Sequence, residues 1–206
     1  MNQDLLISLP AILIAIVCHE YAHGYVAYKL GDDTAKNEGR LTLNPIKHID
    51  PVGFLSMLFF KFGWAKAVPV NAANFKNPKK GMFYVGLAGP LTNFIIAFLT
   101  AVIIRILENY SIQLNEYLYI FLIFLLYYNV MLGIFNLIPL PPLDGSKVLI
   151  SLLPNKWNYY FYKYERYLYI LTVIFIMSNG ASKVMGPFVN AMMNFLVRFI
   201  LGGQIS

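Results

Sequence analysis

Residues 16–28 read IVCHEYAHGYVAY, and this stretch decides how the rest of the chain is interpreted. His19 and His23 are four residues apart, so in an α-helix they project from nearly the same face, one turn apart. Two imidazoles placed in this way can bind one zinc ion. Glu20 is rotated by about 100° from His19 around the helix axis, where its carboxylate can take a proton from an attacking water, as in HExxH hydrolases. The stretch therefore predicts His19 and His23 as metal ligands and Glu20 as general base.

HExxH is a short pattern that arises by chance in many soluble proteins, so its surroundings decide its weight. Here it lies inside the apolar run at residues 5–30, in a chain that is 58% hydrophobic and only 13% charged. A carboxylate at the centre of a membrane helix costs about 2.5 kcal/mol or more, so such groups usually mark function. The alternative is a structural helix whose three polar side chains bond to one another. The insertion cost favours the zinc site.

The apolar composition also indicates the fold class. Five stretches approach the roughly 20 apolar residues that a membrane-spanning helix needs, although the last two are short: residues 5–30, 82–106, 117–140, 166–178 and 187–202. The apolar segment at 51–60 is too short to span and is expected to be re-entrant or interfacial. Residues 63–81 are expected to form a loop or a weak surface hairpin. We therefore predict an all-α polytopic membrane protein of about five transmembrane helices, with residues 1–206 forming a single domain.

The net charge of +6 has two possible meanings, nucleic-acid binding or membrane orientation. The basic residues lie between hydrophobic spans and form no continuous basic face, so nucleic acid is not an expected partner. Residues 29–80 hold nine Lys or Arg against four acidic residues. By the positive-inside rule this segment faces the cytoplasm. Since the two histidines lie toward the same end of the first helix, we expect a multi-pass protein of the cell membrane with its active site toward the cytoplasmic side.

Two histidines leave a tetrahedral zinc site short of one protein ligand if water takes the fourth position. Asp144 is a candidate, because it lies in the proline-broken segment FNLIPLPPLDG at 135–145, at the end of the third hydrophobic span. Its alternative interpretation is a turn residue before Gly145. His48 and Asp50 are competing ligands from the loop after the first helix. Position in the membrane favours Asp144, because it lies at the same depth as the two histidines. An uncompensated carboxylate there would cost free energy, whereas zinc supplies the compensating charge.

Four motifs together resemble one family over almost the whole chain. They are HEYAHG at 19–24, GRLTLNP with HIDPVG at 39–53, AGPLTN at 88–93 and FNLIPLPPLDG at 135–145. The chain is similar to the site-2 protease family of intramembrane zinc metalloproteases, in a minimal form without a PDZ or CBS domain. The resemblance implies one zinc ion per chain, Asp144 as the third ligand, and regulated intramembrane proteolysis of a transmembrane segment of a membrane protein substrate. It also implies that Asn93 and Asn136 help to hold substrate or steady the transition state.

The two asparagines have a physical interpretation of their own. An amide in an apolar helix is expected to face a cavity or another helix, where it either donates to a developing oxyanion or bonds between helices. Gly86 and Gly89 are expected to permit close helix approach. Two rival functions remain: a non-enzymatic membrane protein that binds zinc, and a catalytically idle relative that binds transmembrane helices. The presence of Glu20 beside the two histidines argues against both, because a passive site needs no base.

Overall fold

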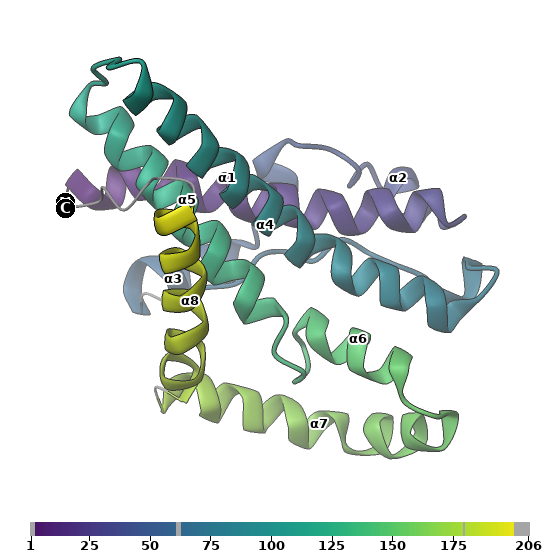
Figure 1. The fold of residues 1–206 in the computed structure, drawn as a ribbon. Coiled ribbons are helices and arrows are strands. Elements are labelled where there is room, and N and C mark those ends of the chain that lie inside the picture. The colour runs from purple at the N-terminus through teal and green to yellow at the C-terminus, as the bar shows by residue number, and fades with distance from the viewer. Residues whose placement is uncertain (1–2, 61–62, 179, 200–206) are drawn as a thin grey trace.

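The computed structural model describes residues 3–60, 63–178 and 180–199, and all regular structure in these ranges is helical (Figure 1). The helices are α1 Gln3–Lys29, α2 Thr34–Asn37, α3 Pro51–Phe60, α4 Pro78–Asn109, α5 Glu116–Asn136, α6 Asp144–Leu152, α7 Asn155–Met177 and α8 Gly180–Phe199, with short 3-10 turns η1 Pro45–Lys47 and η2 Ala72–Asn74. The prediction of an all-α membrane protein is confirmed.

Three described helices are long and apolar enough to cross a bilayer: Leu6–Lys29 within α1, and all of α4 and α5. α7 and α8 satisfy the same conditions only as a pair bent by 72°, which makes up to four spans. The described part of the chain therefore does not reach the expected number of five. The reason lies in α7, whose first half carries four charged residues: Lys156, Lys163, Glu165 and Arg166.

The centre of the molecule is built from α1, α4 and α5, each of which contacts the other two (Figure 1). α8 lies against α5, and α6 packs against α4. One hydrophobic cluster joins α4, α5 and α8, with small residues on α4 that let the helices approach closely. Its buried members include Ala97, Ala101, Leu126, Val130, Met185 and Val189.

The long connection between α1 and α4 begins with a sharp turn. Gly31 has φ of +103°, a left-handed conformation that favours glycine after a helix C-terminus. The N–H of Asp32 then donates to the carbonyl of Ala27 at 3.0 Å, which closes the end of α1. This turn directs the following residues back along α1.

The rest of this connection contains the segment at 51–60 and the stretch at 63–81, for which the sequence made two predictions. The segment at 51–60 forms α3, a single helix of ten residues; its re-entrant or interfacial placement stays a prediction. Of the stretch at 63–81, residues 63–77 form the expected loop, which contains η2, and residues 78–81 begin α4. The only strand pairing among the described residues is an isolated bridge between Ile49 and Ala65, and Pro69 and Pro78 lack the N–H groups that a longer ladder would use.

Candidate metal centre

The two histidines of HEYAH project from α1 toward the same point. Their Nε2 atoms lie 3.0 Å apart, and the rings meet nearly edge to face. Each residue is buried, with only 4% of His19 and 5% of His23 exposed. The one-turn spacing read from the sequence therefore brings both imidazoles to one site.

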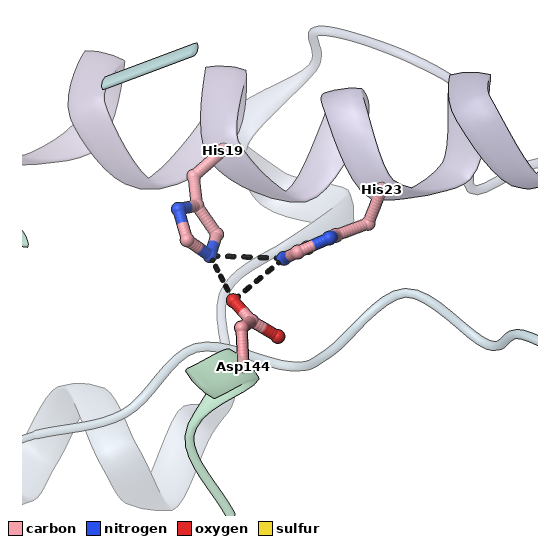
Figure 2. A group of neighbouring side chains, drawn as sticks. All are labelled: His19, His23 and Asp144. Carbon is pink, nitrogen blue, oxygen red and sulfur yellow. Dashed lines mark hydrogen bonds and ion pairs between the residues drawn. The ribbon is translucent and has the colours of Figure 1, made fainter. Parts of the chain in front are cut away.

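Asp144, the first residue of α6, completes the group (Figure 2). Its Oδ2 lies 3.0 Å from Nε2 of His19 and 2.9 Å from Nε2 of His23. Its other oxygen, Oδ1, accepts from the ammonium of Lys147 at 2.8 Å. The carboxylate is therefore ionised.

The remaining ring nitrogens fix how the histidines are protonated. Nδ1 of His23 lies 2.7 Å from the carbonyl oxygen of Val85, which can only accept, so this nitrogen carries the hydrogen. Nδ1 of His19 lies 2.6 Å from Oδ1 of Asn93, the oxygen of an amide whose nitrogen donates elsewhere. In neutral imidazoles the Nε2 atoms then face Asp144 with their lone pairs.

Three electron-rich atoms thus converge within 3.0 Å of one another with no hydrogen between them. Such a cluster is repulsive unless a cation neutralises it. Ligand atoms held at about 2.0–2.2 Å from a tetrahedral zinc ion lie roughly 3.3 Å apart, close to the separations observed here. The residues therefore fit zinc: two imidazole nitrogens and one carboxylate oxygen are ligands it accepts, and they leave a fourth position.

Glu20 stands apart from these three atoms. Among the described residues the group able to hold a metal consists of His19, His23 and Asp144 alone. Oε2 of Glu20 instead accepts from the backbone N–H of Val68 at 2.8 Å. The carboxylate is half-buried and lies on the adjacent face of α1, the arrangement expected for a base rather than a ligand.

Asn93 and Asn136 occupy different surroundings. Both hydrogens of the fully buried Asn93 amide are taken, one by the carbonyl of Ala15 at 3.1 Å and one by Oδ1 of Asn129 at 2.8 Å. In this conformation Asn93 orients His19 and has no hydrogen free for an oxyanion. Asn136 donates within its own helix, to the carbonyl of Leu132 at 3.1 Å. A substrate role for either residue stays a prediction.

Two residues near the site were not identified from the sequence. Asn129 carries the same signal as the other two asparagines, an amide within an apolar helix, and that signal would have found it. Lys147 lies one turn after Asp144 on α6, and it escapes notice because nothing in the sequence shows that α6 begins at Asp144.

α4 passes the histidines at Gly89. A Cβ atom built there would lie 2.5 Å from Cε1 of His19 and 2.6 Å from Nε2 of both His19 and His23. These distances are shorter than any real contact, so the site needs glycine at this position. The expected close helix approach thus occurs directly at the candidate ligands.

The competing ligands from the loop do not reach the centre. The buried ring of His48 donates from Nε2 to the carbonyl of Thr42 at 2.7 Å. Asp50 accepts from the N–H of Gly53 at 2.8 Å, as a residue preceding a helix often does. Both side chains therefore organise the loop itself.

Comparisons with known proteins agree with this geometry. The family described as Peptidase family M50 matches residues 7–179. A Bacillus subtilis protein named "Putative zinc metalloprotease YwhC" is 39% identical over 184 residues, which cover 87% of this chain and 84% of the relative. "Zinc metalloprotease MJ0392" of Methanocaldococcus jannaschii is 34% identical over 161 residues, or 77% of this chain and 38% of the relative. No solved structure matches the chain significantly. With a zinc-compatible centre on an apolar helix and a family match over most of its length, the chain belongs to peptidase family M50, the site-2 protease family of zinc metalloproteases.

Proposed function

We propose that this metalloprotease hydrolyses peptide bonds in or near the transmembrane segments of other membrane proteins. The observation that carries the proposal is the buried convergence of His19, His23 and Asp144 on a helix that is itself an apolar span, Leu6–Lys29. His19 and His23 lie roughly 20 and 26 Å from the start of that span at 1.5 Å per residue. A centre at this depth is suited to substrates that lie in the bilayer.

Each residue of the centre has a proposed role. Zinc, when bound, acts as a Lewis acid and lets water ionise near neutral pH. His19 and His23 would hold the ion through Nε2 and Asp144 would hold it through Oδ2, while the other oxygen of Asp144 accepts from Lys147. Glu20 takes a proton from the attacking water and delivers it to the leaving amine. Asn93 keeps His19 in the tautomer that leaves Nε2 free.

A cavity of about 700 Å³ beside the centre supports an apolar substrate. It begins on α1 at Ala15, Ile16 and Val17, directly before the HEYAH motif, and continues along α5 and α8. Most of its lining is apolar, including Leu9, Ile12, Met131, Phe135, Met185 and Val189. A substrate helix must unwind locally at the cleaved bond, because helical hydrogen bonding shields its carbonyl groups.

The proposal places the centre toward the cytoplasm and takes residues 1–206 as one metalloprotease domain. Its support is the charge of residues 29–80, the connection between α1 and α4 with the helix ends that flank it, where nine basic residues stand against four acidic ones. The C-terminal end of α1, which carries the histidines, leads directly into this connection. Water would therefore reach the centre from the cytoplasmic side.

Glu20→Gln tests the proposal, because the amide keeps the size and polarity of the side chain but cannot take up a proton. The purified full-length variant should bind zinc like the wild type and lose cleavage of β-casein, an unfolded protein that offers extended peptide bonds. In cells, membrane proteins shortened by the wild type should persist at full length in the variant. Substantial cleavage by the purified variant would remove Glu20 from the base role. If the protein is catalytically idle, cells that carry the wild type and cells that carry Glu20→Gln should contain the same membrane protein fragments.

A further inference from the structure

Residues 65–71 cross α1 beside Glu20, and we call this segment the strap. At its middle, the N–H of Val68 donates to Oε2 of Glu20 at 2.8 Å. The buried Val68 side chain packs on Gly24, one helical turn beyond Glu20, where an added Cβ would lie 3.0 Å from Cγ1 of Val68. The strap therefore lies directly on the part of the helix that carries the general base.

Arg40 fixes the strap just before Val68. Its Nη2 donates to the carbonyl of Lys66 at 2.7 Å and to that of Ala67 at 3.2 Å. Arg40 is only 6% exposed, and no carboxylate within 4 Å pairs with it in the described part of the chain. A buried guanidinium is costly unless hydrogen bonds compensate it. The two strap carbonyls compensate Nη2, whereas the buried Nε of Arg40 has no hydrogen-bond partner in the described part of the chain.

Asp32 fixes the strap just after Val68. Its Oδ2 accepts from the N–H of Asn71 at 2.7 Å, and its Oδ1 accepts from the side chain of Asn74 at 2.7 Å. Burial favours a raised pKa, but hydrogen bonds from Thr34, Asn71 and Asn74 outweigh it and lower the pKa of Asp32. This fully buried carboxylate stays ionised and keeps its hydrogen bond from the backbone N–H of Asn71.

The start of the strap is held as well. The N–H of Lys66 donates to the carbonyl of His48 at 2.9 Å, beside the bridge between Ile49 and Ala65. Arg40 belongs to the GRLTLNP motif and His48 to the HIDPVG motif, and neither motif contributes a side chain to the metal centre. Both motifs instead hold one short piece of backbone, at Lys66 and Ala67.

We propose that Arg40 and Asp32 are positioning residues for the general base: they fix the strap on either side of Val68, whose N–H then holds the Glu20 carboxylate in one orientation. The inference rests on the proposed role of Glu20. A glutamate side chain has several rotamers, whereas a base acts only within about 2.6–3.2 Å of the proton it takes. A hydrogen bond to a carboxylate is strong enough to select one of these rotamers.

The direct test removes the Val68 N–H; the same change weakens the Ala67 carbonyl as the acceptor of its 3.2 Å bond from Arg40, which the Arg40 variants below test separately. Replacing Val68 by its α-hydroxy acid, through nonsense suppression in the full-length protein, converts that peptide bond to an ester and keeps the side chain. The matched control is the same replacement at Val70, whose N–H makes no hydrogen bond among the described residues. We expect kcat on β-casein to fall by about tenfold to 100-fold at position 68, the loss typical of a misplaced catalytic group. KM and zinc content should match those of the Val70 control.

Variants of Arg40 provide a second, independent test of the proposal. Arg40→Met removes both bonds to the strap and should lower kcat, while Arg40→Lys keeps a donor and should recover part of it. A merely structural role would lower zinc content and the melting temperature together with kcat.

The outcomes separate the two hypotheses. A Val68 ester with the kcat of the Val70 control overturns the positioning role. Loss of zinc and folding in both the Val68 ester and Arg40→Met also overturns it, because the strap is then only part of the fold. Cleavage by Glu20→Gln would instead refute the proposed base role of Glu20, on which the inference rests.

Discussion

Replacing Gly89 by alanine would place a methyl group against both histidines of the metal centre without altering any of the proposed ligands. The new Cβ would lie 2.5–2.6 Å from three atoms of the two imidazole rings. Ordinary van der Waals contact begins at about 3.4 Å, so the rings would have to retreat by roughly 0.8–0.9 Å.

The rings have little room for that movement. Nδ1 of His19 is held by Asn93 and Nδ1 of His23 by the carbonyl of Val85, both at 2.7 Å or less. Loss of a residue that merely orients a metal ligand typically costs 10- to 100-fold in metal affinity. Because Gly89→Ala displaces two ligands at once, we expect zinc affinity to fall by at least about 100-fold, and cleavage of β-casein to fall with it.

Zinc affinity can be measured by competition with a chromophoric chelator on the purified full-length protein. Gly186→Ala is the matched control, since it also lies within a helix and a Cβ there would meet nothing within 4 Å. The control should bind zinc like the wild type. If Gly89→Ala binds zinc as tightly as Gly186→Ala does, the metal does not lie where the two Nε2 atoms converge.

Three further predictions follow from the same geometry. Asp144→Ala should lower both zinc occupancy and cleavage, whereas His48→Ala should leave zinc largely in place; metal analysis of the purified variants would expose the reverse pattern if the site closes through the loop. Asn93→Leu should weaken zinc binding by about 10- to 100-fold, because His19 loses the partner that orients its ring; an unchanged affinity would mean that the tautomer is set by other contacts. A cysteine at Lys76 should be protected from a membrane-impermeant thiol reagent on intact cells and a cysteine at Asn109 labelled, and the opposite labelling would invert the proposed topology.

The convergence of His19, His23 and Asp144 was predictable from the sequence to an unusual extent, because the parts of this candidate site obey local rules. The spacing of His19 and His23 follows from the helical repeat alone. Asp144 required an argument about membrane depth together with the family resemblance, and the structure brings it within 3.0 Å of both histidines. Polar groups in apolar helices are informative for the same reason, since lipid offers them no alternative partner.

What escaped prediction depends on contacts between distant backbone segments. Nothing local to Val68 indicates that its N–H meets Glu20, because that contact is made by bonds from residues 32 and 40 and by packing on Gly24. The count of about five spans stays a prediction for a related reason. The short apolar stretches at 166–178 and 187–202 were assigned separate crossings, but the bend between α7 and α8 is a tertiary feature.

The distance along the chain between the histidines and Asp144, 121 residues from His23, has a consequence for biosynthesis. A growing chain inserts α1 first, and both histidines are in the membrane while α4, α5 and α6 are still untranslated. Such a chain holds neither Gly89, which shapes the pocket for the rings, nor the carboxylate that completes the proposed ligand set. The candidate metal centre is therefore incomplete until Asp144 at the start of α6 has been synthesised. Cleavage becomes possible only after α6 has been synthesised. The nascent chain is therefore inactive during most of its own synthesis.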